Sequence, residues 1–331
     1  MSQKRIELVV LAALAVTLVL GCATSGPAIA KHPAKSSRAV TPGIMLMAHG
    51  GDEAWNEAIK QTVKPLAKEH PVEIAFGMAD RATMKEALHR LGDQGVTQVA
   101  VVRMFVSRDS FIAETESILG LRPPLEHPAT HEHESHADSH GGHHMSAPDP
   151  IPLTARVLLS REGVAESPLV DEILLDRAKK LSREPKRERV LILAHGPGDD
   201  AENERWLDDM RRRTQPLREV GFQDVRCETL REDWPERREQ SEKRIREYVE
   251  DARTNGEQVI VIPFRVAGFG PYADVLSGLD YLSDGLGFCP HPNMTRWIKE
   301  TAEECFESSN DQSTTPLASI AGRQGRSGDV K

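Results

Sequence analysis

The sequence predicts an α/β protein of two tandem domains, each built around a parallel sheet. Short apolar runs, long enough for buried strands, alternate with segments whose apolar residues have helical spacing. This alternation occurs twice along the chain, and each series opens with a strand that ends in Ala-His-Gly, at residues 48–50 and 194–196. Alternating strands and helices are typical of parallel sheets with helices on their faces. The sequence therefore indicates two similar α/β units in one chain.

The first series runs from Gly43 to about residue 183. The apolar run Gly43-Ile44-Met45-Leu46-Met47 predicts a buried strand that enters a glycine turn. Further elements are expected in this order: a helix over 53–69, a strand over 72–76, a helix over 81–91, a strand over 96–106 and a last strand near 153–159. We assign residues 43–183 to domain 1.

The second series repeats this order from residue 187 to residue 306. The expected elements are a strand over 189–193, a helix over 201–218, a strand over 222–229, a charged helix over 236–253 and a strand over 259–264. The ends of the two series also match, because Leu158-Leu159-Ser160 leads to a helix at Pro168 and Tyr281-Leu282-Ser283 leads to one at Pro292. Such self-similarity predicts a monomer with two pseudo-equivalent domains.

The N-terminal segment is typical of a signal peptide. A short basic region precedes an apolar run over 8–20, which is shorter than the roughly 20 residues needed to span a membrane. The run ends in Val19-Leu20-Gly21-Cys22, which is similar to a bacterial lipobox, so we expect cleavage after residue 21 and lipidation of Cys22. The alternative is an ordinary secreted protein that is cleaved near residues 28–30. Residues 22–42 predict a flexible tether, which places the folded part in the cell envelope, facing the periplasm or the exterior.

Composition excludes some classes of function. The chain has 331 residues and a formal net charge of -9, so it lacks the basic surface typical of nucleic-acid-binding proteins. Four cysteines, none in a Cys-x-x-Cys motif, indicate neither a disulfide-rich scaffold nor a zinc ribbon. Cys227, in a predicted strand, is expected to be a core residue, while a single pair among Cys227, Cys289 and Cys305 is the alternative in an oxidising compartment.

A histidine-rich insertion interrupts domain 1 before its last strand. Residues 123–150 have almost no large apolar side chains, so a loop without fixed structure is expected there. Imidazoles at this density can bind one or two ions such as Zn, Ni, Co or Cu. The candidate ligands are His127, His131, His133, His136, His140, His143 and His144. A solvated spacer is the alternative, and residues 307–331 predict a loose polar tail.

The order of these motifs resembles one known family. The strand ending in Ala-His-Gly, the strands 72–76 and 99–105, and the closing segment Gly287-Phe288-Cys289-Pro290-His291-Pro292 are similar to the CbiX-type sirohydrochlorin chelatases of the class II chelatase superfamily. The resemblance covers roughly residues 43–306. It implies two tandem chelatase-like, Rossmann-like three-layer α/β/α domains with the active site in the cleft between them.

The resemblance also implies an activity, namely insertion of a divalent metal such as cobalt, iron or nickel into a tetrapyrrole. His49 and His195 match the family's first histidine, and each is expected to act as metal ligand or proton acceptor. A second histidine is expected after the third strand, but Ser110 or Phe111 takes that place in the first half and Pro271 or Tyr272 in the second. The ligands implied are therefore a divalent metal (Co, Ni, Fe or Zn) and a tetrapyrrole.

Three functions stay in competition: a lipid-anchored chelatase, a non-catalytic envelope protein that binds metal or tetrapyrrole, and a degenerate domain pair used for interaction. The acidic residues Asp52, Glu53, Asp199 and Asp200 either line the cleft or occupy first helical turns, where carboxylates are expected anyway. Side chains that can meet a tetrapyrrole are Trp55, Arg108, Arg265 and Tyr272. His291 is expected to be structural, and the mixed charges of 231–253 predict a solvated helix without a function of its own.

Overall fold

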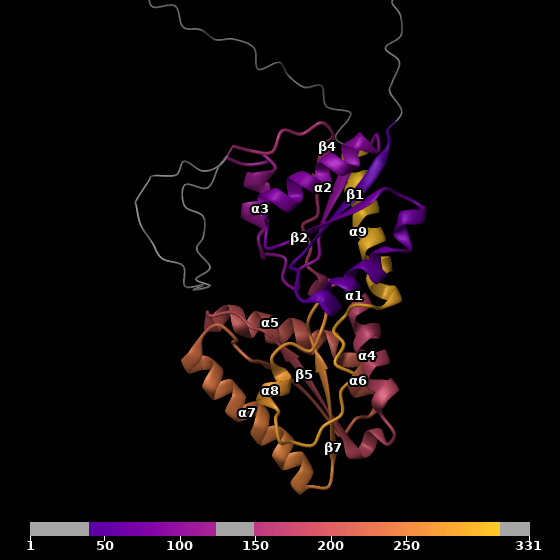
Figure 1. Cartoon of the computed structure of the whole chain (residues 1–331). Helices are drawn as coiled ribbons and strands as arrows, with labels where there is room; N and C mark the ends of the chain where they lie inside the picture. The colour runs from indigo at the N-terminus through magenta and orange to yellow at the C-terminus, as the bar shows by residue number, and fades with distance from the viewer. Residues whose placement is uncertain (1–39, 124–148, 312–331) are drawn as a thin grey trace, which may run out of the picture. The chain divides into compact units, whose positions relative to one another are not determined.

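The computed structural model describes residues 40–123 and 149–311 (Figure 1). The predicted signal peptide, nearly all of the tether, the seven histidines of the insertion and residues 312–331 lie outside the described residues. In the part that is described, no helix is long and apolar enough to cross a membrane.

The first sheet is parallel, with the strand order β2-β1-β3-β4. Its strands are β1 (Pro42–Ala48), β2 (Val72–Phe76), β3 (Gln98–Arg103) and β4 (Arg156–Leu159). Successive side chains of β1 enter different cores, since Ile44 and Leu46 belong to one apolar cluster and Met45 and Met47 to another. Both faces of the sheet are therefore covered, as is usual for parallel sheets.

The second sheet has the order β6-β5-β7, from β5 (Glu188–Ala194), β6 (Asp224–Thr229) and β7 (Gln258–Pro263). Leu282 adds a parallel bridge to Ile260 of β7, in the same way that Leu158 of β4 pairs with Ala100 of β3. The two sheets thus share one order of strands. The α/β class with parallel sheets that we predicted is confirmed.

The helices follow the predicted order, with two interruptions at proline. The helices of the first half are α1 (Glu53–Val63), α2 (Arg81–Asp93) and α3 (Ile112–Ile118), and those of the second are α5 (Asp200–Arg213), α6 (Gln215–Val220), α7 (Pro235–Thr254) and α8 (Tyr272–Val275). The single helices predicted over 53–69 and 201–218 are each divided. Pro65 and Pro216 lie at the breaks, because proline cannot donate the backbone hydrogen bond that a continuous helix needs.

Two further helices cross between the halves. Helix α4 (Leu169–Leu181) follows β4 but packs against β7 and α6, whereas α9 (Pro292–Asp311) follows the second sheet but packs against β1, β3 and β4. The packing therefore crosses the predicted boundary between domains 43–183 and 187–306. Helix α9 also continues to Asp311, into the stretch predicted as the beginning of a loose tail.

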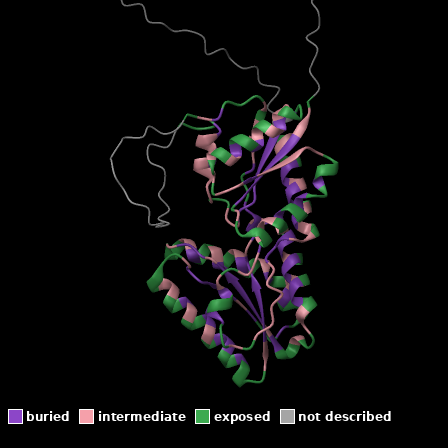
Figure 2. Cartoon of the chain, in the orientation of Figure 1, coloured by how far each residue is buried: buried purple, intermediate pink, exposed green. Residues whose placement is uncertain are grey.

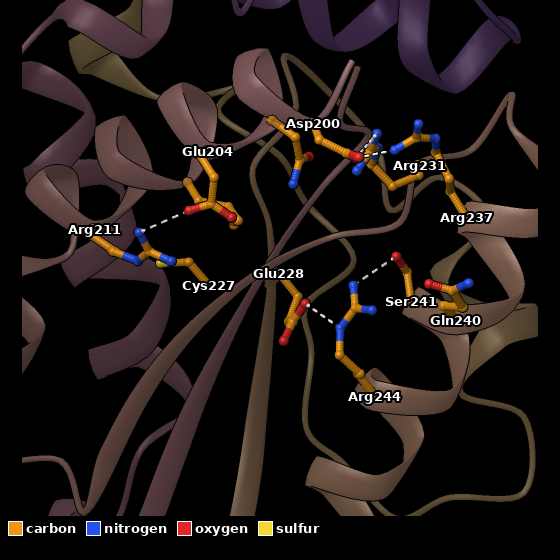
Figure 3. Close-up of a pocket in the computed structure, with 12 residues that line it drawn as sticks. Asp200, Glu204, Arg211, Cys227, Glu228, Arg231, Arg237, Gln240, Ser241 and Arg244 are labelled. Atoms are coloured by element: carbon orange, nitrogen blue, oxygen red, sulfur yellow. Dashed lines mark hydrogen bonds and ion pairs between the residues drawn. The ribbon is translucent and has the colours of Figure 1, made fainter. Parts of the chain in front are cut away.

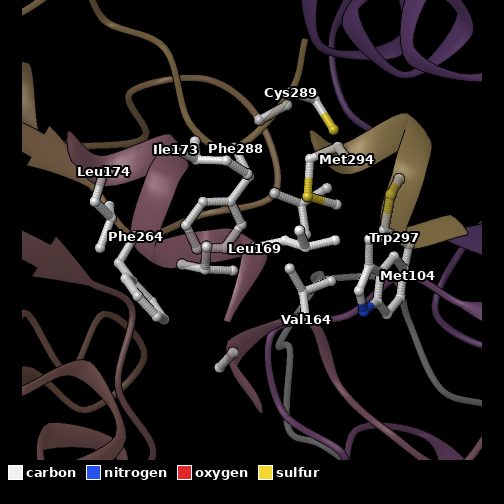
Figure 4. Packing of buried hydrophobic residues seen from close by; sticks show 14 of the residues in the cluster. Met104, Val164, Leu169, Ile173, Leu174, Phe264, Phe288, Cys289, Met294 and Trp297 are labelled. Carbon is white, nitrogen blue, oxygen red and sulfur yellow. The ribbon is translucent and has the colours of Figure 1, made fainter. Parts of the chain in front are cut away.

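One apolar cluster runs through both halves because of this exchange. It joins Val102 of β3 and Ile260 of β7 through residues of α4 and α9, including Ile173 and Trp297 (Figure 4). The sheets and the inner helix faces are buried, while the outer helix faces are exposed (Figure 2). Cys227 lies in this cluster, as predicted, and Cys227, Cys289 and Cys305 are all free thiols.

Arg103, at the end of β3, is the largest fully buried side chain, with 1% of its surface exposed. Its guanidinium donates to four backbone carbonyls, those of Arg108, Ser110, Ser160 and Arg161, at 2.8–3.1 Å. Burial lowers the pKa of Arg103 to about 10, so the group stays charged at neutral pH. One cation thus fixes the loops that follow β3 and β4.

The turn before α9 leads to a prediction about pH. His291 Nδ1 accepts a hydrogen bond from the Asn293 amide at 3.1 Å, and its Nε2 lies 3.3 Å from Asp176. Burial lowers the pKa of His291 below its usual 6.5, although Asp176 opposes the shift. A depressed histidine pKa means that the unfolded chain binds the proton more tightly. The stability that His291 contributes is therefore present above pH 6.5 and is lost as the pH falls through its folded pKa.

We expect the free energy of unfolding to fall less between about pH 7 and pH 5 in His291→Asn than in the unchanged protein. Urea unfolding across this range measures the difference. His89→Asn is the control, since His89 is exposed and pairs only with Asp93 of its own helix. An identical pH dependence of His291→Asn and the unchanged protein would contradict the prediction.

Candidate functional site

The Ala-His-Gly turns have the same local geometry in both halves. His49 Nδ1 lies 2.8 Å from the carbonyl of Gly50, and His195 Nδ1 lies 2.7 Å from the carbonyl of Gly196. Since a carbonyl only accepts, Nδ1 is the donor in each ring, and Nε2 is the nitrogen that is left for other partners. Both glycines have positive φ, +83° and +78°, which a side chain disfavours. Each strand end therefore presents an imidazole Nε2 that can act as base or metal ligand.

His195 has two carboxylate neighbours. Its Nε2 lies 3.0 Å from Asp233 Oδ2 and 3.9 Å from Glu232 Oε2, in the loop that joins β6 to α7. The Trp234 ring lies edge-on to the imidazole, with 6.3 Å between ring centroids. A lone pair aimed at carboxylate oxygens needs a cation between them, either a proton or a metal ion. His195 and its two carboxylate neighbours can therefore take up a proton from a ligand or hold a positive charge.

Glu232 links His195 to the segment after β7. Its Oε1 accepts from Arg265 at 2.5 Å, and the Arg265 guanidinium lies 5.8 Å from the centre of the Tyr272 ring. Burial opposes the charge of Arg265, but Tyr272 and Glu232 outweigh it and raise the pKa of the guanidinium. Tyr272, where a second histidine was expected, is fully buried, and burial raises the pKa of its hydroxyl. Tyr272 therefore supports Arg265 and has no surface for a tetrapyrrole, contrary to our expectation.

His49 is more open than His195. Its side chain is exposed, and in the described part of the chain no ion pair joins it to a carboxylate. Of Ser110 and Phe111, the two residues that can stand in place of its expected second histidine, Phe111 packs against Phe105. No contact between His49 and His195 is present among the described residues, so a site shared by the two rings stays a prediction.

The acidic residues near the two histidines have structural partners. Asp52 accepts from the Trp55 amide and Asp199 from the Glu202 amide, both at 2.8 Å, so these carboxylates cap α1 and α5. Asp200 forms ion pairs with Arg231 and Arg237. Glu53 and Asp200 lie in the first turns of α1 and α5, as the interpretation of first-turn carboxylates predicts, whereas Asp52 and Asp199 are the caps of these helices.

Residues from both halves meet at a cavity of about 180 Å³. Arg108 and Asp109 after β3, and Glu166 after β4, line one side, while Arg205 and Trp206 of α5 line the other. Arg108 is held by an ion pair to Glu166. The carboxyl ends of the sheets are the usual place for ligands in α/β folds.

The other predicted ligands lie outside the described residues, namely Cys22, His127, His131, His133, His136, His140, His143 and His144. Within residues 40–123 and 149–311, no three or more His, Cys, Asp or Glu side chains are arranged to hold a metal ion. His195, with Asp233 at 3.0 Å and Glu232 at 3.9 Å, does not form such a group either.

Arg231, Glu232 and Asp233 were missed by the sequence analysis, which assigned them to a solvated run. Arg231 is buried, with 6% exposed, and its backbone amide donates to the carbonyl of His195 at 2.7 Å. The positions of these residues in the sequence did indicate that they lie near His195. They directly follow the strand that pairs with β5, so their loop has to lie at the same sheet edge as His195.

Comparison with known proteins places this geometry in context. Residues 43–149 match the CbiX family model. The CbiX match covers the first half of the folded part and does not include His195. No curated protein matches the sequence.

Among solved structures, SirB from Bacillus subtilis with Fe3+ is similar, with a TM-score of 0.55 and 17% identity, covering 82% of this chain and 98% of that one. The sirohydrochlorin chelatase SirB from Bacillus subtilis subspecies spizizenii, in complex with cobalt, gives a TM-score of 0.52 and 14% identity, with the same coverage. A multi-domain protein from Deinococcus radiodurans, described as structurally similar to chelatases, matches at a TM-score of 0.48 and 17% identity. This match covers 80% of this chain and 55% of that one. The two SirB likenesses show a chelatase-type fold that extends over both halves, beyond the CbiX match.

Proposed function

We propose that this protein is a metal chelatase of the sirohydrochlorin type, which places a divalent metal ion in a tetrapyrrole. The observation that carries the proposal is the repeated turn in which Nδ1 of His49 and of His195 is bound to a glycine carbonyl and Nε2 is left for a ligand, with Asp233 beside His195. The CbiX match over residues 43–149 and the SirB-like fold support it.

The chemistry required is removal of two pyrrole N–H protons as the metal ion enters the ring. His195 Nε2 can accept one of the two protons, with the imidazolium that forms stabilised by Asp233 at 3.0 Å, and the other proton is released to solvent water. Glu232, held by Arg265, keeps a second negative charge 3.9 Å from the ring and so favours both the proton and an incoming cation. The metal ion is a substrate in this scheme.

A non-catalytic protein that captures metal or tetrapyrrole at the envelope is the second candidate. The observation in its favour is that no histidine stands where the resemblance implies a second one, because Ser110 or Phe111 takes that place in the first half and Pro271 or the buried Tyr272 takes it in the second. Such a protein binds the same ligands but does not accelerate their reaction.

One assay separates the two candidates. The full chain in mild detergent is mixed with sirohydrochlorin and Co²⁺, and the absorbance change is followed against a control without protein. A chelatase accelerates the insertion. Binding of sirohydrochlorin or metal without acceleration would support the second candidate instead, and absence of both would contradict each of them.

We further propose that His127, His131, His133, His136, His140, His143 and His144 supply metal to this site. Deletion of residues 127–144 is expected to remove most of the bound Co²⁺ or Ni²⁺ equivalents measured by calorimetry, because imidazoles are the expected ligands. A deletion protein with unchanged stoichiometry would rule out the storage role.

Cys22 is proposed as a lipid anchor that holds the protein in the cell envelope. We expect the full chain made in a bacterium to incorporate an alkyne-labelled fatty acid and to sediment with membranes, and Cys22→Ser to lose the label. Cys305→Ser is the matched control, because Cys305 lies on α9, far along the chain from the lipobox-like segment. Label retained in Cys22→Ser would refute the anchor.

A further inference from the structure

A second pocket, of about 460 Å³, opens beside β6 between α5 and α7 (Figure 3). Four arginines line it, namely Arg211 of α5, Arg231 after β6, and Arg237 and Arg244 of α7. Leu207 and Cys227 add an apolar part to the lining. The volume is in the range of small-molecule sites.

The pocket is cationic although the whole chain carries a net charge of -9. Its four arginines face three carboxylates, Asp200, Glu204 and Glu228, so four positive charges minus three negative charges leave one positive charge. Arg244 lies 3.5 Å from Glu228, and Arg211 lies 3.7 Å from Glu204 and 2.7 Å from Asp208, which is outside the lining. Each guanidinium has five N–H donors, more than these contacts use.

Arg231 shows that the pocket is a built feature of the fold. It has a φ of +60°, a left-handed conformation that costs free energy for residues other than glycine. Its side chain is 8% exposed, one amine donates to Asp200 at 3.0 Å, and its buried Nε has no hydrogen-bond partner among the described residues. Strain of this kind is typical of ligand sites.

We propose that this pocket binds a small organic acid with at least two carboxylates. The half-exposed arginines Arg211, Arg237 and Arg244 would receive the carboxylates, since guanidinium and carboxylate form paired, charge-assisted hydrogen bonds. Leu207 and Cys227 would contact the carbon chain, which an inorganic anion lacks. The site does not include His49 or His195 and does not depend on the chelatase proposal.

The test is calorimetry of the metal-free full chain in mild detergent with tricarballylate, at about pH 8, where ordinary histidines are neutral. We expect saturable binding of one equivalent and a loss of affinity of about tenfold or more in Arg237→Gln and in Arg244→Gln, because each removes a charged donor. Arg253→Gln, at an exposed position on the same helix α7, is expected to bind like the unchanged protein.

Three results would overturn the proposal. These are no binding, equal affinity for inorganic phosphate, or equal losses in Arg253→Gln and in the two pocket variants. Thermal unfolding of each variant, recorded without ligand, shows that a loss of affinity is not a loss of fold. Arg237 and Arg244 form partly exposed ion pairs that contribute little to stability, so both variants are expected to fold.

Discussion

Replacing His195 with alanine is expected to lower the rate of cobalt insertion into sirohydrochlorin about 100-fold. Removal of a positioned proton acceptor typically costs two to four orders of magnitude. His195 is positioned on three sides: Gly196 fixes the tautomer, Asp233 faces Nε2, and Arg231 donates to its backbone carbonyl. The initial rate of the absorbance change, at saturating Co²⁺ and sirohydrochlorin, measures the loss.

His49→Ala is expected to have a smaller effect, because His49 is exposed and lacks a described carboxylate partner at Nε2. His89→Ala serves as the control for loss of an exposed histidine, since His89 lies on α2 beside Asp93. Asp233→Asn should slow insertion less than His195→Ala, since Asp233 lies beside Nε2 at 3.0 Å but is not the proposed proton acceptor. Equal rates in His195→Ala and the unchanged protein would exclude His195 as the proton acceptor.

Replacing Arg103 with methionine is expected to destabilise the protein by roughly 3–5 kcal/mol. Methionine fills a similar volume but leaves the carbonyls of Arg108, Ser110, Ser160 and Arg161 without their common donor. Each buried acceptor left unpaired costs about 1–3 kcal/mol, and loops that reach water recover part of this loss. Urea unfolding gives the free energy directly.

Arg156→Met is the matched control, because Arg156 is exposed on the neighbouring strand β4 and its loss is expected to change stability by less than about 0.5 kcal/mol. Arg103→Lys should be almost as harmful as Arg103→Met, since one ammonium cannot reach four carbonyls in different directions. A loss below about 1 kcal/mol in Arg103→Met would mean that the loops after β3 and β4 do not depend on this cation.

The strands were predictable because their residues are apolar on both faces, as in β1 and β5, and such runs are typical of buried parallel strands. Helix ends were predictable where a cap or proline marks them, but Pro65 and Pro216 were not recognised as breaks within longer periodic segments. The exchange of α4 and α9 was not predictable, since amphipathicity shows that a helix needs an apolar partner but not which sheet provides it.

At the candidate site, sequence periodicity predicted that His49 and His195 lie at strand ends. The structure shows which side chains surround them. Glu232 and Asp233 belong to a run of mixed charges, in which a carboxylate that contacts His195 looks the same as a solvated one. Their role depends on the pairing of β6 beside β5, which is a tertiary contact. His49 is exposed whereas His195 has carboxylate partners, and this difference also depends on tertiary contacts that the sequence does not show.

The exchange of α4 and α9 has a consequence for dissecting this chain. A fragment that ends near residue 183 would carry α4 without the strand it packs on and would leave β3 without α9, so its apolar faces would be open to water. The complementary fragment would have the opposite defect. Neither half is therefore expected to be a free-standing unit, and co-expressed halves should recover a folded protein only by assembling with each other. Gene truncations in this protein thus test the integrity of the whole fold and do not separate the contribution of one histidine from that of the other.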